Sequence, residues 1–332
     1  MSHRVAVLGA TGYAGRELIS LIGRHPRLEL AYAACRADAG KTLDQLMPGA
    51  PSQPLCALED VTCSQLDTVF LCMPHGASAP WAYRAWQAGC RVIDLSADFR
   101  LVSPDQDHPY PELLQQAVYG LTELARQALP QSQLIANPGC YPSSVLLGLA
   151  PLLKAGYLKS GTVISDSKSG VSGAGRAASV ANLFGEVAEN VRPYQVGDQH
   201  RHRQEMNQQM AAYGGGSAQV LFVPQVVPCF RGMISSLYVD WQDHWDLRTL
   251  YQQMYHDEAF VQLLPQGEVA TMAHSRGSNR CVISLHPLPQ LGKLLILSSL
   301  DNLLKGAAGQ ALQNLNAAQG WPESEGLPRC GS

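Results

Sequence analysis

Short apolar runs alternate with amphipathic segments over the first 140 residues. Residues 5–8 are apolar, a glycine-rich turn follows, and residues 16–24 carry apolar side chains at four positions that fit one helix face. This order predicts a strand, a loop and a helix. Further strands are predicted at residues 28–34, 68–73, 91–95 and 134–136, with a helix at residues 77–88 and an Asp- and Pro-rich loop at residues 103–111. Apolar strands alternating with helices predict a doubly wound, parallel α/β sheet.

The pattern changes after Pro151. Strands now follow one another with little helix between them, at residues 162–165, 219–227, 233–241, 281–285 and 293–300, with one helix at residues 247–256. Consecutive strands joined by turns predict a mixed or antiparallel sheet in a second domain of α+β type. A last amphipathic helix at residues 302–317 could pack back on the first domain. We therefore expect one domain of residues 1–139 with the returning segment 301–332, and another of residues 140–300.

Length and charge narrow the class of protein. A chain of 332 residues is too long for one ordinary core, which agrees with two domains. The formal net charge of -3 gives no electrostatic reason to expect nucleic acid or an anionic membrane as partner. Only 15% of the residues are charged, which favours a homo-oligomer because interface centres are depleted in charge. No stretch reaches the roughly 18 apolar residues that span a bilayer, so we expect a cytoplasmic protein.

Nine cysteines are spread along the chain without a CxxC pair, which argues against a disulfide framework or a zinc ribbon. Cys140 differs from the other eight, because it follows a predicted strand and Gly139 and precedes a helix predicted at residues 145–153, with Pro142 near its first position. The positive end of a helix dipole lowers the pKa of a thiol, and the N–H groups there could hold an oxyanion. This setting suits a covalent nucleophile, with an inert buried thiol as the alternative.

Three glycines, Gly9, Gly12 and Gly15, lie between the first strand and the first helix. Their spacing lets the backbone turn sharply and approach a pyrophosphate at a helix N-terminus, although a plain tight turn would also use glycine. NAD binders usually carry Asp or Glu about 20 residues further on, where this chain has Arg36. A guanidinium suits a 2′-phosphate, so the sequence favours NADP over NAD unless Arg36 is only a solvated charge.

A polar segment from Tyr194 to Glu205 contains His200 and His202. The two histidines could be zinc ligands, an acid and base oriented by the carboxylate of Glu205, or part of a polar surface. Zinc would need a further ligand. An imidazole that titrates near neutrality is the usual partner of a cysteine nucleophile. The residues alone leave these three interpretations open.

Seven segments, in order along nearly the whole chain, resemble those of one family: residues 9–15, 94–100, 137–143, 169–176, 200–205, 228–234 and 301–307. The most specific is Asn137-Pro-Gly-Cys-Tyr-Pro-Ser143. With these segments the chain resembles the N-acetyl-gamma-glutamyl-phosphate reductases of arginine biosynthesis. It departs from the family pattern at Gln204, where Pro is frequent, and at Ser143, where Thr is frequent. Both departures leave the side chains of the proposed chemistry in place.

The resemblance implies the fold of the semialdehyde and glyceraldehyde-3-phosphate dehydrogenases, an α/β protein with a Rossmann-type NADP-binding domain and an α+β domain for substrate and dimerisation. It also implies reduction of N-acetyl-glutamyl 5-phosphate by NADPH to the 5-semialdehyde and inorganic phosphate. Cys140 would form a thioester, His200 would be the acid and base, and no metal would take part. The sequence leaves open which of His200 and His202 carries the proton.

By the same resemblance, further residues are expected around the ligands. Substrate contacts are expected from His202, Glu205, Tyr194, Arg100, Arg231, Ser143 and Asn137. Cofactor contacts are expected from Gly9, Thr11, Gly12, Tyr13, Ala14, Gly15, Arg36, Pro74, Ser96, Gly173 and Asn302. Arg100 and Arg231 could instead form structural ion pairs. We expect His75 to be a loop residue near the cofactor.

Two other functions remain open at this point. The sister reductase of lysine biosynthesis acts on an aminoadipyl phosphate one methylene longer, and a methylene separates substrates by only about 1 to 3 kcal/mol. A non-enzymatic NADP-binding regulator could use the same scaffold, but it would not need the Cys140 turn or the histidine segment. A homodimer or a homotetramer would each suit the low charge.

Overall fold

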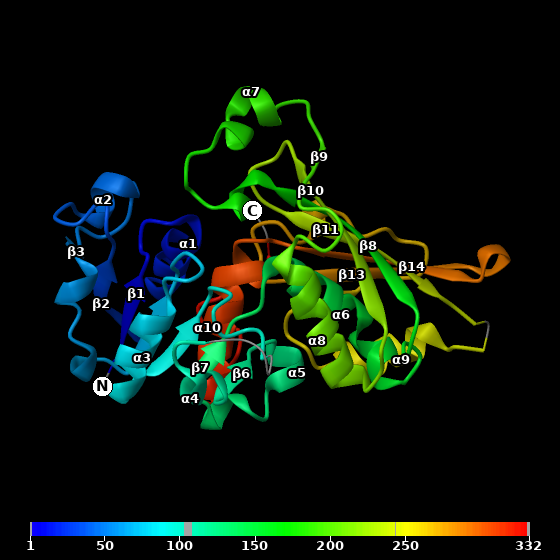
Figure 1. The fold of residues 1–332 in the computed structure, drawn as a ribbon, viewed down its shortest axis with the longest axis horizontal. Coiled ribbons are helices and arrows are strands. Elements are labelled where there is room, and N and C mark those ends of the chain that lie inside the picture. The colour runs from blue at the N-terminus through cyan, green and yellow to red at the C-terminus, as the bar shows by residue number, and fades with distance from the viewer. Residues whose placement is uncertain (1, 103–107, 243, 331–332) are drawn as a thin grey trace. The chain divides into compact units, whose positions relative to one another are not determined.

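The computed structural model describes residues 2–102, 108–242 and 244–330 and divides into two compact units. The first unit comprises Met1–Gly139 and Ala307–Leu327, and the second comprises Cys140–Gly306 and Pro328–Ser332. The chain thus returns to the first unit after Gly306, whereas we expected the return at residue 301. Part of the loop predicted at residues 103–111 lies outside the described residues, at 103–107. Figure 1 shows the elements of both units.

The first unit is built on a seven-stranded sheet in the order β3-β2-β1-β4-β5-β7-β6, with every neighbouring pair parallel. Its strands are β1 (His3–Leu8), β2 (Leu28–Ala34), β3 (Leu55–Cys56), β4 (Thr68–Leu71), β5 (Arg91–Asp94), β6 (Ala117–Tyr119) and β7 (Leu134–Ala136). The helices are α1 (Tyr13–Ile22), α2 (Leu43–Leu46), α3 (Ala79–Gln87), α4 (Pro111–Leu114), α5 (Thr122–Ala125) and α10 (Gly309–Ala318). The predicted parallel α/β sheet is confirmed. The short strands β3 and β6 were not predicted.

Helix α10 is not the amphipathic helix that the sequence predicts. Its carboxamide side chains are buried together with its apolar ones, and they bond to the chain around α5. Gln310 donates to the Thr122 hydroxyl at 2.7 Å, and Asn314 donates to the carbonyl of Gly120 at 2.7 Å. These bonds from the side-chain amide nitrogens hold the helix in place, although the side-chain oxygen of Gln310 is buried without a hydrogen-bond partner among the described residues.

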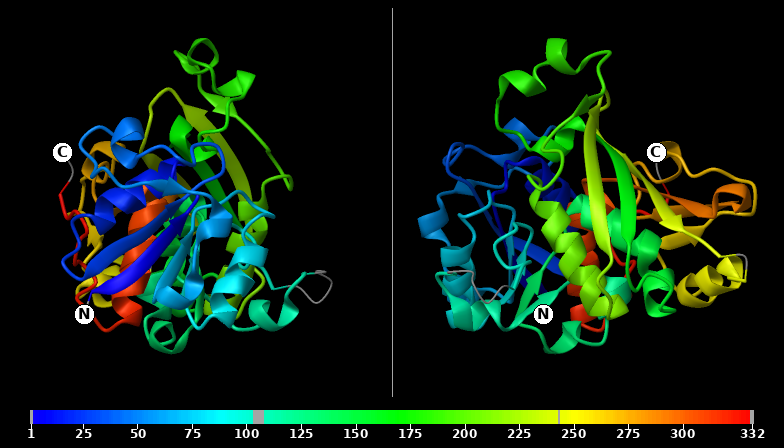
Figure 2. Two further views of the ribbon diagram at one scale, coloured as in Figure 1. Left: turned by 90° about the vertical axis from the view of Figure 1, so that its left-hand side faces the viewer. Right: turned by 45° about the vertical axis from the view of Figure 1, so that its right-hand side comes forward.

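The second unit is built on a mixed seven-stranded sheet in the order β12-β13-β14-β11-β8-β10-β9. Its strands are β8 (Thr162–Gly170), β9 (Arg192–Pro193), β10 (Gln219–Val227), β11 (Met233–Asp240), β12 (Val261–Leu263), β13 (Cys281–Leu288) and β14 (Lys293–Leu300). The helices are α6 (Cys140–Lys154), α7 (Phe184–Val187), α8 (Arg201–Gly214) and α9 (Leu247–Tyr255). The pairs β8/β10 and β12/β13 are parallel and the others antiparallel, so the predicted mixed sheet is confirmed. Figures 1 and 2 show α6 and α8 side by side on one face of this sheet.

Helix α6 is buried almost throughout, yet it contains Pro151. A proline has no N–H, so the carbonyl of Leu147 lacks its usual partner four residues on. The hydroxyl of Tyr255 donates to that carbonyl at 2.5 Å, and the hydroxyl of Tyr251 donates to the carbonyl of Gly148 at 2.5 Å. Two tyrosines of α9 therefore satisfy the carbonyls around the proline. Among the described residues, no helix is long and apolar enough to cross a membrane.

Candidate active site

Cys140 is the first residue of α6 and is half-buried. The helix begins earlier than predicted, and Pro142 falls in its first turn, where an N–H has no partner within the helix. A side chain on Gly306 would bring its Cβ to 2.8 Å from the Cβ of Cys140, so only glycine leaves room beside the thiol. All nine cysteines are free. The structure thus places the thiol at an accessible helix N-terminus.

Two phenols lie next to Cys140. Tyr141 is buried and donates to the carbonyl of Gln225 at 3.2 Å, and the hydroxyl of Tyr194 donates to that of Tyr141 at 3.4 Å. Burial, together with the charge of Cys140, raises the pKa of Tyr194 to about 12. Burial also raises the pKa of Tyr141 strongly. Both groups therefore stay protonated at neutral pH and can only donate their O–H hydrogens.

Two imidazoles complete this cluster. The ring of His200 lies 5.9 Å from that of Tyr141 and 5.5 Å from that of Tyr194, centroid to centroid. The ring of His202 lies 4.7 Å from that of His200 and 6.0 Å from that of Tyr141. His202 and Glu205 are buried one turn apart on α8. The structure thus brings together Tyr194, His200, His202 and Glu205, which the sequence placed in one segment.

The two histidines have different hydrogen bonds. His200 precedes the first residue of α8, and its Nδ1 accepts the backbone N–H of His202 at 3.1 Å. Burial, together with the charge of Arg201, lowers the pKa of His200 to about 4. A neutral ring that accepts at Nδ1 carries its hydrogen on Nε2, so His200 can donate a hydrogen bond there, while its Nδ1 lone pair is engaged by the N–H of His202. The acid and base role of His200 stays a prediction.

The zinc interpretation of this segment finds no support either. No group of three or more His, Cys, Asp or Glu side chains in the described part of the chain is arranged to hold a metal ion.

Ser143 is buried in the first turn of α6, close to Cys140 in sequence. Its contact with substrate stays a prediction.

Arg231 was predicted to bind the substrate, with a structural ion pair as the alternative. Its guanidinium contacts the fully buried carboxylate of Asp301 through both forks, at 2.8 and 3.0 Å. This ion pair occupies one edge of the guanidinium, formed by Nε and Nη2. The structure therefore favours the structural alternative for Arg231.

Asn302 is buried beside this ion pair. Its side-chain oxygen accepts the N–H of Gly232 at 2.8 Å, and its amide donates to the Ser172 hydroxyl at 2.9 Å. These bonds connect two turns of the second unit, and Gly173 follows Ser172 in an exposed position. The predicted cofactor contacts of Gly173 and Asn302 stay predictions, with a structural role for Asn302 added.

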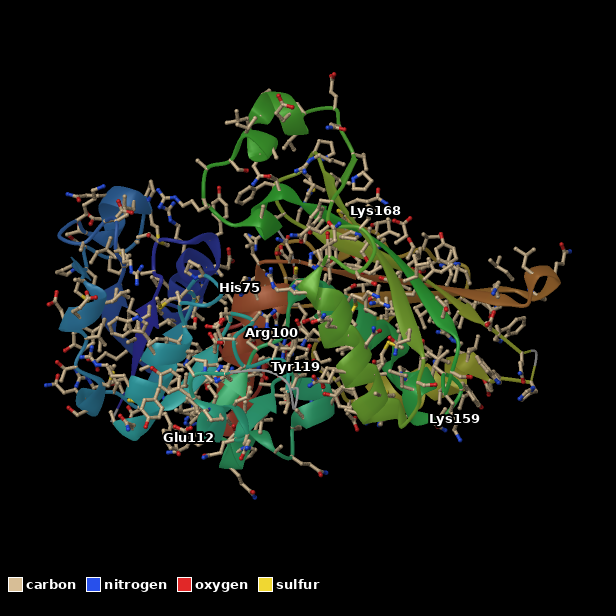
Figure 3. All side chains as sticks on the ribbon, viewed as in Figure 1. His75, Arg100, Glu112, Tyr119, Lys159 and Lys168 are labelled. Atoms are coloured by element: carbon tan, nitrogen blue, oxygen red, sulfur yellow. The ribbon has the colours of Figure 1, made fainter. Side chains whose placement is uncertain are left out.

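Asn137 belongs to the turn before Cys140, and Arg100, from the chain after β5, contacts that turn within the first unit. Arg100 is buried and donates to the carbonyls of Asn137 at 2.8 Å and Leu95 at 2.7 Å. The side chain of Asn137 donates to the carbonyl of Ala307 and accepts from Asn314, at 3.2 and 3.0 Å. These bonds fix the turn, and direct contact of either residue with substrate stays a prediction. Figure 3 labels Arg100.

The glycine loop of the first unit fits a phosphate group. Gly9 has a φ of +89°, and a Cβ there would come 2.2 Å from the carbonyl oxygen of Cys72. A Cβ on Gly15 would come 2.3 Å from the carbonyl oxygen of Gly9. Gly12, by contrast, precedes α1 and offers no side-chain cap to its first N–H groups. Thr11, Tyr13 and Ala14 complete this half-buried loop. The residues therefore match the predicted pyrophosphate cradle.

The end of β2 carries the residues that were predicted to select between dinucleotides. Arg36 is exposed just beyond Ala34, the last residue of the strand. The next carboxylate along the chain, Asp38, is buried and forms an ion pair with Lys41 at 2.7 Å. A carboxylate held this way is a poor partner for a ribose hydroxyl, whereas the guanidinium of Arg36 faces solvent.

Comparison with known proteins identifies the family. The model of the semialdehyde dehydrogenase NAD-binding domain matches residues 4–132, and that of the semialdehyde dehydrogenase dimerisation domain matches residues 140–302. An N-acetyl-gamma-glutamyl-phosphate reductase of Halorhodospira halophila is 48% identical, covering 97% of each chain. The chain belongs to the N-acetyl-gamma-glutamyl-phosphate reductase family. A reductase of the same name from Desulfotalea psychrophila is 41% identical and covers 98% of this chain and 97% of its own.

Solved structures share the fold of this reductase family member. Aspartate semialdehyde dehydrogenase II of Vibrio cholerae, complexed with ASA, superposes with a TM-score of 0.77 at 20% identity, covering 96% of this chain and 98% of its own. Aspartate semialdehyde dehydrogenase of Candida albicans with NADP superposes with a TM-score of 0.71 at 15% identity, covering 96% and 99%. The predicted semialdehyde dehydrogenase fold is confirmed.

In this reductase family member, the loop after β5 has a second set of hydrogen-bonded groups. The carboxylate of Asp98 accepts the N–H groups of Gly76, Ser78 and Ala79 before and at the start of α3, at 2.7 to 3.1 Å. Nδ1 of His75 accepts the N–H of Ala97 at 2.8 Å, in keeping with the loop role expected of it. The sequence segment containing Asp98 was noticed, but its capping role was missed because its partners lie about 20 residues away along the chain.

Ser96 belongs to the same loop and is fully buried. Its hydroxyl donates to the carboxylate of Asp94 at 2.6 Å and accepts the N–H of Asp98 at 3.1 Å. Burial raises the pKa of Asp94 to about 6. Ser96 thus has a structural role, and its contact with cofactor stays a prediction, like that of the exposed Pro74 nearby.

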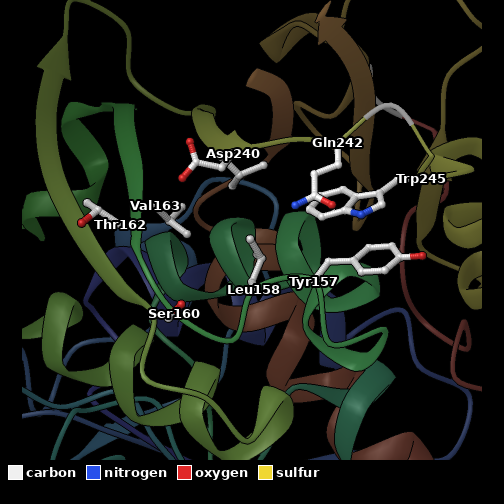
Figure 4. Close-up of a pocket in the computed structure, with 9 residues that line it drawn as sticks. Tyr157, Leu158, Ser160, Thr162, Val163, Asp240, Gln242 and Trp245 are labelled. Atoms are coloured by element: carbon white, nitrogen blue, oxygen red, sulfur yellow. The ribbon is translucent and has the colours of Figure 1, made fainter. Parts of the chain in front are cut away.

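A separate hollow of about 80 Å³ lies near the stacked rings of Tyr157 and Trp245, whose centroids are 4.2 Å apart (Figure 4). It is lined by Tyr157, Leu158, Ser160, Thr162, Val163, Val239, Asp240, Gln242 and Trp245. Asp240 forms an ion pair with Lys293. None of the predicted site residues lines this hollow, and it is too small for an acyl phosphate.

Proposed function

We propose that this protein is an NADPH-dependent reductase of arginine biosynthesis. It would convert N-acetyl-glutamyl 5-phosphate into N-acetyl-glutamate 5-semialdehyde and inorganic phosphate. The observation that carries the proposal is the cluster of Cys140, two protonated phenols and two imidazoles in one unit. The names of relatives at 41 and 48% identity support this substrate.

The cluster supplies the groups that acyl transfer needs. The thiolate of Cys140 attacks the acyl carbon, the C–O bond to phosphate breaks, and a thioester forms on sulfur. The N–H groups at the start of α6 stabilise negative charge on the carbonyl oxygen. Reduced nicotinamide, when bound, supplies the hydride that brings the acyl group to the aldehyde level. The C–S bond then breaks and returns the thiolate to Cys140.

We assign the proton carrier to His202 rather than to His200. His200 is neutral, with Nδ1 accepting a backbone N–H, so its Nε2–H suits a hydrogen bond to an oxygen of the substrate. His202 lies beside the same tyrosine ring and has Glu205 one turn further along α8 to orient it. An imidazole with an orienting carboxylate is a common arrangement for proton transfer.

We further propose NADP(H) as the cofactor and place it on the first unit. Supporting this, Arg36 is exposed at the end of β2 while Asp38 is engaged by Lys41. The second unit would hold the substrate and the contacts between subunits, since its residues match the dimerisation domain of the family. A homodimer or a homotetramer is proposed on that basis.

The reverse reaction tests the function. Purified protein with phosphate, NADP and N-acetyl-glutamate 5-semialdehyde should form NADPH, and omitting phosphate should stop the reaction. Formation of NADPH without phosphate would contradict the thioester mechanism. The homologous aminoadipate semialdehyde in the same assay distinguishes the lysine branch, which would use it better.

A substitution of the nucleophile tests whether the protein is an enzyme at all. Cys140→Ser should abolish phosphate-dependent NADPH formation but retain binding of NADP, measured by fluorescence titration. Unchanged turnover in Cys140→Ser would leave the proposed chemistry without support. Absence of turnover in the unmodified protein, with binding of NADP intact, would favour the regulator.

A further inference from the structure

The proposed substrate carries two oxyanions, a carboxylate and a phosphate, and each calls for cationic partners. The two arginines expected to hold them are engaged elsewhere, Arg231 with Asp301 and Arg100 with backbone carbonyls. Two other cationic side chains of the second unit near the Cys140 cluster each form an ion pair with a carboxylate. Lys168 contacts Asp166 at 2.5 Å, and Arg203 contacts Asp198 at 2.7 Å.

The strand that contains Arg192 is paired with a strand that contacts the cluster. Arg192 lies in β9, which pairs with β10 so that Arg192 is opposite Val226 and Pro193 is opposite Gln225. Gln225 is the residue whose carbonyl accepts the hydroxyl of Tyr141. The backbone N–H of Tyr194 donates to Pro224 at 3.1 Å, which keeps β9 and the second phenol in register with this edge. Arg192 therefore lies in the strand that ends just before Tyr194, beside the strand whose Gln225 carbonyl binds Tyr141.

Arg201 is next to the cluster because it begins helix α8. It is the first residue of α8, follows His200 directly and is exposed. Electrostatics agree with the placement of both arginines, because Arg201 and Arg192 each oppose the rise in the pKa of Tyr194. Cys140 acts on the same phenol with the opposite sign. The thiol and both guanidinium groups thus all affect the pKa of Tyr194.

Resting on the function proposed above, we infer that Arg192 and Arg201 together bind an oxyanion of the substrate, a carboxylate or a phosphate, beside the Cys140 cluster. A guanidinium presents five N–H donors in a planar fork that matches either group. Arg192 donates one of them to the carbonyl of Ala181 at 3.2 Å, which orients its side chain. Arg201 lies within the segment 194–205 that the sequence singled out, but that segment pointed to the histidines, and Arg192 lies outside it.

Steady-state kinetics of the reverse reaction test this inference. Arg192→Gln and Arg201→Gln should each raise one KM about tenfold or more, as expected for a lost charge-assisted hydrogen bond. A rise in KM for the semialdehyde identifies the carboxylate as the ligand, and a rise in KM for phosphate identifies the phosphate. The Lys variants, which keep the charge, should restore part of the loss. Arg203→Gln on the same helix is the matched control and should change neither KM.

A second measurement does not depend on the identity of the substrate. The rates at which iodoacetate and iodoacetamide alkylate Cys140 are measured by mass spectrometry of its peptide. The first reagent is anionic and the second neutral, so their ratio reports the field at the thiol independently of its ionisation. Losing one nearby positive charge should lower the ratio about fivefold, and Arg203→Gln should leave it unchanged.

The outcomes separate this inference from the proposed function. If both glutamine variants are folded and active with unchanged KM values and an unchanged alkylation ratio, the two arginines do not bind the oxyanion. If the unmodified protein has no activity with the semialdehyde, the proposed function fails, while the alkylation ratio still tests the arginines. Melting temperatures of all variants show whether any loss comes from unfolding.

Discussion

Replacing each of the two histidines of α8 by asparagine separates their roles. The Nδ1 atom of His200 caps the helix by accepting the N–H of His202. Asparagine is among the best residues at this position because its side-chain oxygen accepts the same N–H, whereas alanine costs about 1 kcal/mol of stability. His200→Asn should therefore fold like the original protein, and His200→Ala should be less stable by about that amount.

The two asparagine variants should differ in turnover. His202→Asn should lower kcat about 10² to 10⁴-fold, the usual contribution of a general acid and base, and should remove a limb of the pH profile. His200→Asn should mainly raise KM, because it loses only the donor at Nε2. The assay is phosphate-dependent formation of NADPH between pH 5 and 9, with the melting temperature of each variant as the control for folding.

Stability at acid pH gives an independent check on His200. Its pKa in the folded protein is about 4, below the ordinary value of 6.5, so the unfolded chain takes up the proton first. The contribution of the neutral ring is present above pH 6.5 and is lost as the pH falls towards 4. His200→Asn should weaken this loss of stability.

One result in the turnover assay would refute the reasoning. If His200→Asn removes kcat and the limb of the pH profile as fully as His202→Asn does, His200 carries the proton and the argument from its cap bond is wrong.

Three further changes test other parts of the structure. Gly9→Ala should destabilise the first unit in thermal unfolding by about 3 kcal/mol or more, since its Cβ would lie 2.2 Å from a carbonyl oxygen. Gly12→Ala, whose Cβ would lie 3.5 Å from the nearest atom, should fold but weaken NADPH binding in a fluorescence titration. Tyr255→Phe should cost about 1 to 3 kcal/mol in urea unfolding, and clearly less beside Pro151→Ala, which restores an N–H; equal costs in the two backgrounds would contradict the pairing. Because the pKa of Asp94 is raised to about 6, the folded state holds its proton more tightly, so stability should fall by at most about 3 kcal/mol as the pH rises from 4 to 6, a slope that Asp94→Asn should remove.

The sequence predicted the elements whose buried face is apolar. Strands such as β1 and β10 have fully or alternately buried apolar residues, and both were found close to their expected bounds. Helix α8 was missed because its buried face mixes Met206 and Met210 with His202, Glu205 and Gln209. A helix whose inward side is half polar shows no apolar periodicity, so hydrophobic pattern cannot find it.

The functional cluster was predictable where its members are close in sequence. The strand, turn and helix around Cys140 and the segment from Tyr194 to Glu205 carry local signals. The partners of arginine side chains have no local sequence signal, because Arg231 contacts Asp301 at a separation of 70 residues and Arg100 contacts Asn137 at a separation of 37. Whether an arginine binds substrate or a buried carboxylate is decided by tertiary contacts, and these pairs could be assigned only from the structure.

The division of the chain at Cys140 also explains which parts of the site must move together. The thiol, the two phenols and the two imidazoles all belong to the second unit, and α6 is fixed there by Ser144, whose hydroxyl bonds to the carbonyl of Ser298 at 2.9 Å and to the hydroxyl of Ser235 at 3.0 Å. Their mutual geometry is therefore set by one core. The glycine loop belongs to the first unit, so a change there should alter dinucleotide binding without altering the reactivity of the Cys140 thiol towards a neutral alkylating reagent.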